Sequence, residues 1–239
     1  MTVTVDGIPH TLLGRVGDGE FCDVFYARQD YPTEMVALKV CREEETGAAV
    51  LRHETSKIRA LAAMNVRGSD YFSSFLPGSI RTVRVKQGGK SWTANRYLWR
   101  AGFDYTFEDI FREYPKGIDP RDAIWMWKRM LALLGWVHEC GRVHGSITPQ
   151  HLLVHPRDHG VVFSGWSRVV ESGERLSARS PGYEIYYPKD VWEGGPVNHL
   201  TDIMMSARCI HKALGPDPTN IPDALVNLVS QCVLGALDI

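Results

Sequence analysis

Two neighbouring stretches decide the fold: "TLLGRVGDGEFCDVFYARQ", residues 11–29, and "EMVALKVCR", residues 34–42. The first has two apolar runs on either side of a glycine-containing turn, and the second is a short run of nearly continuous apolar character. Residues 29–34, "QDYPTE", have the composition of a turn. This pattern predicts consecutive β-strands joined by short turns.

The rest of the first hundred residues predicts one helix and one hairpin. In residues 46–64 the side chains of Val50, Glu54, Ile58 and Leu61 are four, four and three positions apart, which places them on one helix face. Residues 79–99 form two strand-like runs around a Gly-Gly turn, which is typical of a β-hairpin.

The sequence changes character near residues 100–102, and the second part is mainly helical. Residues 119–141 begin with Asp-Pro, carry apolar residues at helical spacing and end at a glycine. Two short strands, 151–154 and 160–163, follow, and then two helices near 202–211 and 224–234. A strand-rich first part and a helical second part predict an α+β fold.

Composition and charge exclude several functions. The 239 residues are 44% hydrophobic and 23% charged, and the net charge is −1, so no basic field indicates nucleic acid or an anionic membrane surface as a partner. We find no apolar run long enough for a membrane span and no signal-peptide pattern. The cysteines are odd in number and form no C-x-x-C motif, which predicts free thiols in a reducing cytoplasm.

Taken in order, these stretches resemble a protein kinase over nearly the whole chain. Residues 17–24, "GDGEFCDV", resemble the glycine-rich loop over the ATP phosphates, with Cys22 at the third glycine. The resemblance implies that Lys39, in "VALK", pairs with the phosphates and that Glu54 is its ion-pair partner. It implies a bilobal kinase-like fold forming one domain, residues 1–239, with an N-lobe of about 1–100 carrying one helix and a helical C-lobe of about 103–239.

The second part supports the same resemblance. His144 matches the histidine that opens the catalytic loop, residues 180–183 the end of an activation segment, and Asp202 the aspartate that anchors the loop backbone. The nucleotide-binding residues that the resemblance implies are Gly17, Gly19, Val24, Ala37, Lys39, Glu54 and Leu153. The implied structural spine consists of Ile58, His144, Trp166 and Asp202.

The positions that carry the chemistry of a kinase are replaced. Ser146 stands where the catalytic aspartate belongs, His151 where the magnesium-binding asparagine belongs, and Gly165, or Ser164 if the register slides by one, where the second magnesium ligand belongs. The resemblance therefore implies a degenerate, catalytically inactive protein, a pseudokinase that acts as a scaffold or regulator. We expect protein partners and no magnesium, and the resemblance leaves ATP open as a ligand.

Three alternatives stay open. A metal held by Asp18, Glu20 and Asp23 of the glycine-rich loop would allow a divergent phosphotransferase or another ATP-using transferase. A purely structural interaction protein would have its pocket filled by Trp99 and Trp166. A third interpretation reads four histidines as a metal site, namely His144, His151, His155 and His159.

Two further expectations come from the later part of the chain. Arg168, Arg175 and Arg179 lie in one loop that could receive a phosphate or an acidic partner. Residues 225–239 resemble the penultimate part of a kinase C-lobe, and Lys189 replaces the glutamate that would pair with its final helix, so we expect the end of that lobe to be missing. A narrower resemblance, of residues 144–160 with their H-G-x-x-x-P-x-H-L-L pattern, is to bacterial and phage kinase-like proteins.

Overall fold

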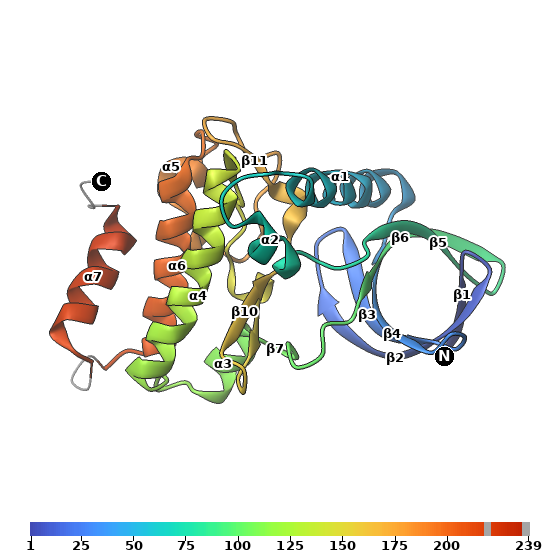
Figure 1. Cartoon of the computed structure of the whole chain (residues 1–239), viewed down its shortest axis with the longest axis horizontal. Helices are drawn as coiled ribbons and strands as arrows, with labels where there is room; N and C mark the ends of the chain where they lie inside the picture. Colours follow the sequence, from blue (N-terminus) through green and yellow to red (C-terminus); the bar gives the residue numbers. More distant parts are fainter. Residues whose placement is uncertain (218–220, 236–239) are drawn as a thin grey trace. The chain divides into compact units, whose positions relative to one another are not determined.

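The computed structural model describes residues 1–217 and 221–235, grouped into two compact units (Figure 1). The barrel unit comprises Met1–Ala63 and Leu76–Arg100, and the helical unit comprises Met64–Phe75 and Ala101–Ile239 as far as it is described. The last stretch discussed above reaches residues 236–239, which lie outside the described residues.

The barrel unit is built from antiparallel strands and one long helix. The strands are β1 (Thr2–Val5), β2 (Ile8–Asp18), β3 (Cys22–Gln29), β4 (Glu34–Cys41), β5 (Arg81–Gln87) and β6 (Lys90–Leu98), and the helix is α1 (Glu44–Ala62). Their order is β1-β2-β3-β4-β6-β5, and the sheet closes on itself, as the ring of strands in Figure 1 shows.

Alternation along the strands fills the barrel with apolar side chains. Every second residue of a strand points to the same face, so a strand in a closed sheet contributes one set of side chains to the interior. The buried set lining the core is Val3, Val5, Ala27, Val36, Leu38, Val83, Val85 and Ala94. Closure also leaves no unpaired sheet edge.

The predicted fold, an α+β bilobal kinase-like fold with a strand-rich, one-helix N-lobe and a helical C-lobe, is wrong. The finding that overturns it is the closed six-stranded barrel. Strand β1 causes the difference because it pairs with both of its neighbours: Val5 lies opposite Ile8 of β2 and opposite Val85 of β5. The strands expected from the sequence begin at Thr11, so the closing strand was not among them.

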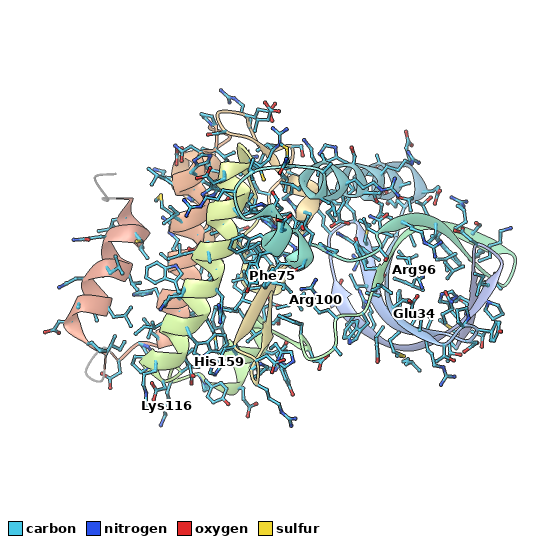
Figure 2. All side chains as sticks on the ribbon, viewed as in Figure 1. Glu34, Phe75, Arg96, Arg100, Lys116 and His159 are labelled. Carbon is cyan, nitrogen blue, oxygen red and sulfur yellow. The ribbon has the colours of Figure 1, made fainter. Side chains whose placement is uncertain are left out.

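One charged side chain lies inside the barrel. Arg96 is 3% exposed, and its Nη2 donates to Gln29 Oε1 at 3.1 Å and to a carboxylate oxygen of Glu34. Figure 2 shows Arg96 and Glu34 within the ring of strands. A buried guanidinium needs such partners because an unpaired charge in an apolar interior is very costly.

The helical unit combines helices with short strands. Its helices are α2 (Ser69–Phe72), α3 (Phe107–Glu113), α4 (Pro120–Glu139), α5 (Lys189–Trp192), α6 (His199–Leu214) and α7 (Asp223–Leu234), with 3₁₀ turns at Ser73–Phe75, Pro149–His151, Trp166–Arg168 and Glu184–Tyr186. Strands β7 (Tyr105–Thr106), β9 (Leu152–His155) and β10 (Gly160–Phe163) form one sheet, and β8 (Arg142–Val143) pairs with β11 (Val170–Glu171).

The predicted hairpin and helices are confirmed as individual elements. Helix α4 begins at Pro120 after the cap residue Asp119, whose carboxylate accepts the N–H of Arg121, and Gly141 follows its end with a positive φ of 68°. Helix α6 begins with a capping box between Asn198 and Thr201. None of the helices in the described ranges is long and apolar enough to cross a membrane.

Candidate functional site

The centre of the candidate site in the barrel unit is a buried ion pair. Lys39 on β4 donates through Nζ to both carboxylate oxygens of Glu54 on α1, at 2.9 and 3.1 Å. The side chain of Glu54 is 3% exposed and that of Lys39 is 19% exposed. The structure thus joins the two residues that the kinase resemblance pairs.

Two residues that the sequence did not reveal complete the coordination of Glu54. Tyr97 Oη donates to Glu54 Oε2 at 2.6 Å, and Asn95 Nδ2 donates to the same oxygen at 3.2 Å. Burial, together with the negative charge of Glu54, raises the pKa of Tyr97 well above its usual value, so the phenol stays protonated and keeps donating. The signal for both residues was the alternation of Asn95 and Tyr97 on β6, continued by Trp99 just after the strand.

Strand register gathers further predicted residues around the ammonium group. Lys39 lies opposite Val24 on one side and Asn95 on the other, and Ala37 lies opposite Tyr26 and Tyr97. All of these belong to the strand face that points away from the barrel interior. The Tyr26 ring lies 4.4 Å from the Trp99 ring, centroid to centroid, so aromatic and aliphatic surface flanks the lysine.

Strand β2 needs a glycine near its end for a local reason. A Cβ on Gly17 would lie 3.1 Å from Val24 Cβ, closer than side chains normally pack. The turn between β2 and β3 is closed by a hydrogen bond of 2.9 Å from the Gly19 N–H to the Cys22 carbonyl. Gly17, Gly19 and Val24 therefore lie together, as the resemblance implies, but tight packing alone accounts for Gly17.

Arginines engage the carboxylates of this turn. Arg15 pairs with Asp18 at 2.8 Å and with Asp23 at 2.5 Å, and Arg42 also binds both carboxylates. Partial burial raises the pKa of Asp23, but hydrogen bonds from Arg42 and Arg15 outweigh it and hold the pKa below its usual value. Two guanidinium groups neutralise these two carboxylates, which disfavours a cation there.

In the helical unit, Asp202 holds the loop that resembles a catalytic loop. Its carboxylate, fully buried on α6, accepts the backbone N–H groups of His144 and Gly145, each at 2.8 Å. His138 Nε2 lies 3.0 Å from the same carboxylate. Of the predicted spine, His144, Trp166 and Asp202 are brought together here, with the His144 and Trp166 rings 4.6 Å apart, while Ile58 belongs to the barrel unit.

The positions that replace the catalytic residues form one closed polar cluster. His151 Nδ1 lies 3.0 Å from each of three oxygens: Ser146 Oγ, Thr148 Oγ1 and the Ser146 carbonyl. Ser146 and Thr148 are fully buried. Gly165 has a positive φ of 78°, and a Cβ there would lie 2.7 Å from His151 Nδ1, so the imidazole occupies the space of a side chain at this position.

The remaining candidate residues lie apart from this cluster. His155 pairs with Asp158 at 3.3 Å, while His159 stacks on Trp125. Leu153 lies half-buried on β9. Within the described ranges no group of three or more metal-type ligands converges.

The loop arginines mainly contact backbone. Arg168 Nε donates to the Ala178 carbonyl at 3.0 Å, Arg175 Nη1 to the Gly194 carbonyl at 2.7 Å, and Arg179 Nε to the Val191 carbonyl at 2.7 Å. Lys189, the residue that replaces a glutamate of the kinase pattern, lies 3.8 Å from Glu193.

The chemistry of the two regions differs. The Lys39 region offers a cationic N–H donor beside apolar surface, which suits an anionic ligand with a flat ring. The Ser146–His151 cluster contains hydroxyls and an imidazole but no carboxylate. No protein-family model matches this chain, and no curated protein matches it either.

Proposed function

We propose that this protein performs no phosphoryl transfer and acts through binding, as a scaffold or regulator for a protein partner. The observation that carries the proposal is the closed cluster of Ser146, Thr148 and His151. Its polar groups are engaged within the protein, and nothing in it supplies the carboxylates that phosphoryl transfer requires.

The size of the expected rate losses supports the proposal that the protein is inactive in phosphoryl transfer. Loss of a general base typically costs about 10²- to 10⁴-fold in rate, and a serine hydroxyl is no base at neutral pH. A bound metal supplies several kcal/mol of charge stabilisation in such reactions, and an imidazole is a poor ligand for magnesium. The carboxylates of Asp18 and Asp23 do not replace it, because Arg15 and Arg42 bind them.

A second candidate function, nucleotide binding without transfer, is favoured by the Lys39 region. An ammonium group has three N–H donors, and Glu54 receives two of them. The third can contact a phosphate, while Val24, Ala37 and Tyr97 provide surface for a base. ATP is accordingly the ligand to test first.

The experiment is thermal unfolding with and without millimolar ATP, each with magnesium and with EDTA. A ligand at 100 times its Kd stabilises the native state by about 2.7 kcal/mol, so we expect a rise of several degrees that persists in EDTA. Lys39→Ala should abolish the rise, whereas Lys86→Ala, an exposed lysine on β5 of the same barrel, should preserve it.

Incubation with γ-labelled and α-labelled ATP separates the alternatives. The proposal expects no label transfer to protein or peptide substrates. Transfer that Lys39→Ala abolishes would establish the divergent transferase instead. If ATP produces no thermal shift, nucleotide binding is rejected while the absence of phosphoryl transfer still stands. That result would favour a purely structural interaction protein.

A further inference from the structure

Two cysteines face each other across neighbouring strands of the barrel. Cys22 begins β3 and Cys41 ends β4, and the register places them directly opposite. The Arg42 N–H, one position after β4, donates to the carbonyl of Phe21, one position before β3, at 2.9 Å. In an antiparallel pair this pattern identifies Cys22 and Cys41 as a non-hydrogen-bonded pair, the kind whose side chains approach most closely.

The geometry of such a pair meets the requirements of a disulfide. The Cα atoms of a non-hydrogen-bonded pair are about 4.5 Å apart, and disulfides need a Cα separation of roughly 4.4 to 6.8 Å. Directly opposite residues also project to the same face of the sheet. The separation typical of such a pair therefore lies within the range that a disulfide spans.

The surroundings keep the two thiols together. Cys22 is 3% exposed and Cys41 is 2% exposed, and both belong to one apolar cluster with Leu51, against which Phe21 and Trp92 pack. The Cys41 thiol donates to Glu44 Oε2 at 3.3 Å. Both cysteines are free thiols in this structure.

We propose that Cys22 and Cys41 are an oxidative modification site, at which a small hydroperoxide forms a disulfide between β3 and β4. One thiol is oxidised by hydrogen peroxide to a sulfenic acid with release of water. The second thiol then attacks that sulfur and releases a second water. The balance is two thiols and one peroxide giving one disulfide and two waters.

Burial determines which oxidants reach the pair. Burial raises the pKa of the Cys22 thiol to about 11, and it raises the pKa of Cys41 as well, so the thiolate is scarce and reaction is slow. Hydrogen peroxide is small enough to approach a packed cluster, whereas a bulky disulfide reagent is not. Cys22 and Cys41, two of the free thiols expected from the sequence, are accordingly the reduced form of a pair that can be cross-linked.

The cross-link would act on the candidate site. It would join Cys22, the first residue of β3 after the glycine-containing turn, to Cys41 of β4. Cys41 lies two positions from Lys39 on the same strand. The inference stands on the strand register and does not depend on the proposed function.

The test is peptide mapping of the whole protein after treatment with hydrogen peroxide and blocking of remaining thiols with N-ethylmaleimide. We expect a Cys22–Cys41 peptide pair that reducing agent separates, formed within one molecule, and a rise in melting temperature of about 5 to 10 °C from closure of the loop between them. The other cysteines should be recovered as blocked thiols.

Variants sharpen the result. Cys22→Ser and Cys41→Ser should each abolish the cross-linked peptide, while Cys140→Ser, a buried cysteine of the helical unit, should leave its yield unchanged. Recovery of Cys22 and Cys41 as blocked thiols at peroxide doses that oxidise exposed methionines would overturn the inference. Irreversible oxidation of one cysteine without a link, or links only between molecules, would overturn it too.

Discussion

Glu54 is a buried carboxylate of the barrel unit that accepts hydrogen bonds from several side chains. Three donors from two strands converge on its carboxylate: Lys39 from β4, and Asn95 and Tyr97 from β6. Because α1 carries Glu54, this one carboxylate attaches the helix to both strands. Its role is structural whether or not a nucleotide binds beside Lys39.

Replacement of Glu54 by alanine should destabilise the fold by about 3 kcal/mol, because it leaves buried donors without an acceptor and removes the partner of a lysine charge. Urea denaturation measures the loss. Glu45→Ala, at an exposed position of the same helix, should change the free energy of unfolding by less than about 0.5 kcal/mol. A cost for Glu54→Ala as small as that of the control would show that the donors find water instead.

At the scale of the element, helix α6 anchors the loop that follows β8. Asp202 makes the main connection through the backbone N–H groups of His144 and Gly145, and the Cys209 thiol adds a hydrogen bond of 3.6 Å to the Ile147 carbonyl. The backbone at His144 and Gly145 is therefore held by contacts that do not involve the side chains of Ser146 or His151.

Asp202→Ala should cost about 3 kcal/mol, since two buried N–H groups lose their acceptor. Asp202→Asn should recover only part of this, because its amide offers one acceptor where two are needed. The measurement is urea denaturation, with Asp190→Ala on exposed α5 surface as the control. Full stability of Asp202→Asn would mean that one of the two N–H bonds contributes nothing.

Strand β1 is the element that turns a sheet into a barrel. Val5 is 2% exposed and sits between β2 and β5. Val5→Ala should lower the free energy of unfolding by about 2 kcal/mol through lost burial and the cavity left behind. It should also speed amide exchange on β5, whereas Thr2→Ala at an exposed position of β1 should not. Unchanged exchange on β5 would show that closure does not depend on β1 packing.

At the scale of the whole molecule, each unit carries a histidine with a lowered pKa: His10, buried in the barrel unit, and His199, half-buried in the helical unit. Burial lowers the pKa of His10 in the barrel despite a hydrogen bond to the Ile8 carbonyl. Burial and the neighbouring His138 lower the pKa of His199 on α6, while Asp202 opposes this. The His138 and His199 rings stack at 4.4 Å, so two positive charges there would repel each other.

Stability should therefore fall on acidification. In the unfolded chain both imidazoles take up a proton near pH 6.5, whereas the folded protein resists protonation to lower pH. Their contribution is complete above pH 6.5 and is lost as the pH falls through the lower folded-state pKa values. Urea midpoints at pH 7.5 and 5.5 should differ less in His10→Gln and His199→Gln than in the parent, and an equal difference would refute the assignment.

Local sequence patterns predicted the individual helices and strands. They could not predict the closed barrel, which depends on pairing between strands far apart in the sequence. Helices α1, α4, α6 and α7 and the hairpin around Gly88 each have a sequence pattern of their own, and α4 and α6 also carry clear end signals. The four residues of β1 carry alternation too, but nothing local states that Val5 pairs with Val85. The Lys39–Glu54 pair was reached through a resemblance, whereas Asn95 and Tyr97 join it through a register that only the folded sheet defines.

The way the chain is shared between the two units limits how it can be dissected. Met64–Phe75 belongs to the helical unit, although barrel sequence precedes and follows it, and there Phe72 stacks near Trp136 at 6.3 Å. A single cut after Arg100 would leave residues 64–75 on the barrel fragment, although they belong to the helical unit. Trp136 would then lose its contact with Phe72. An isolated barrel therefore requires excision of residues 64–75 and a polar linker in their place.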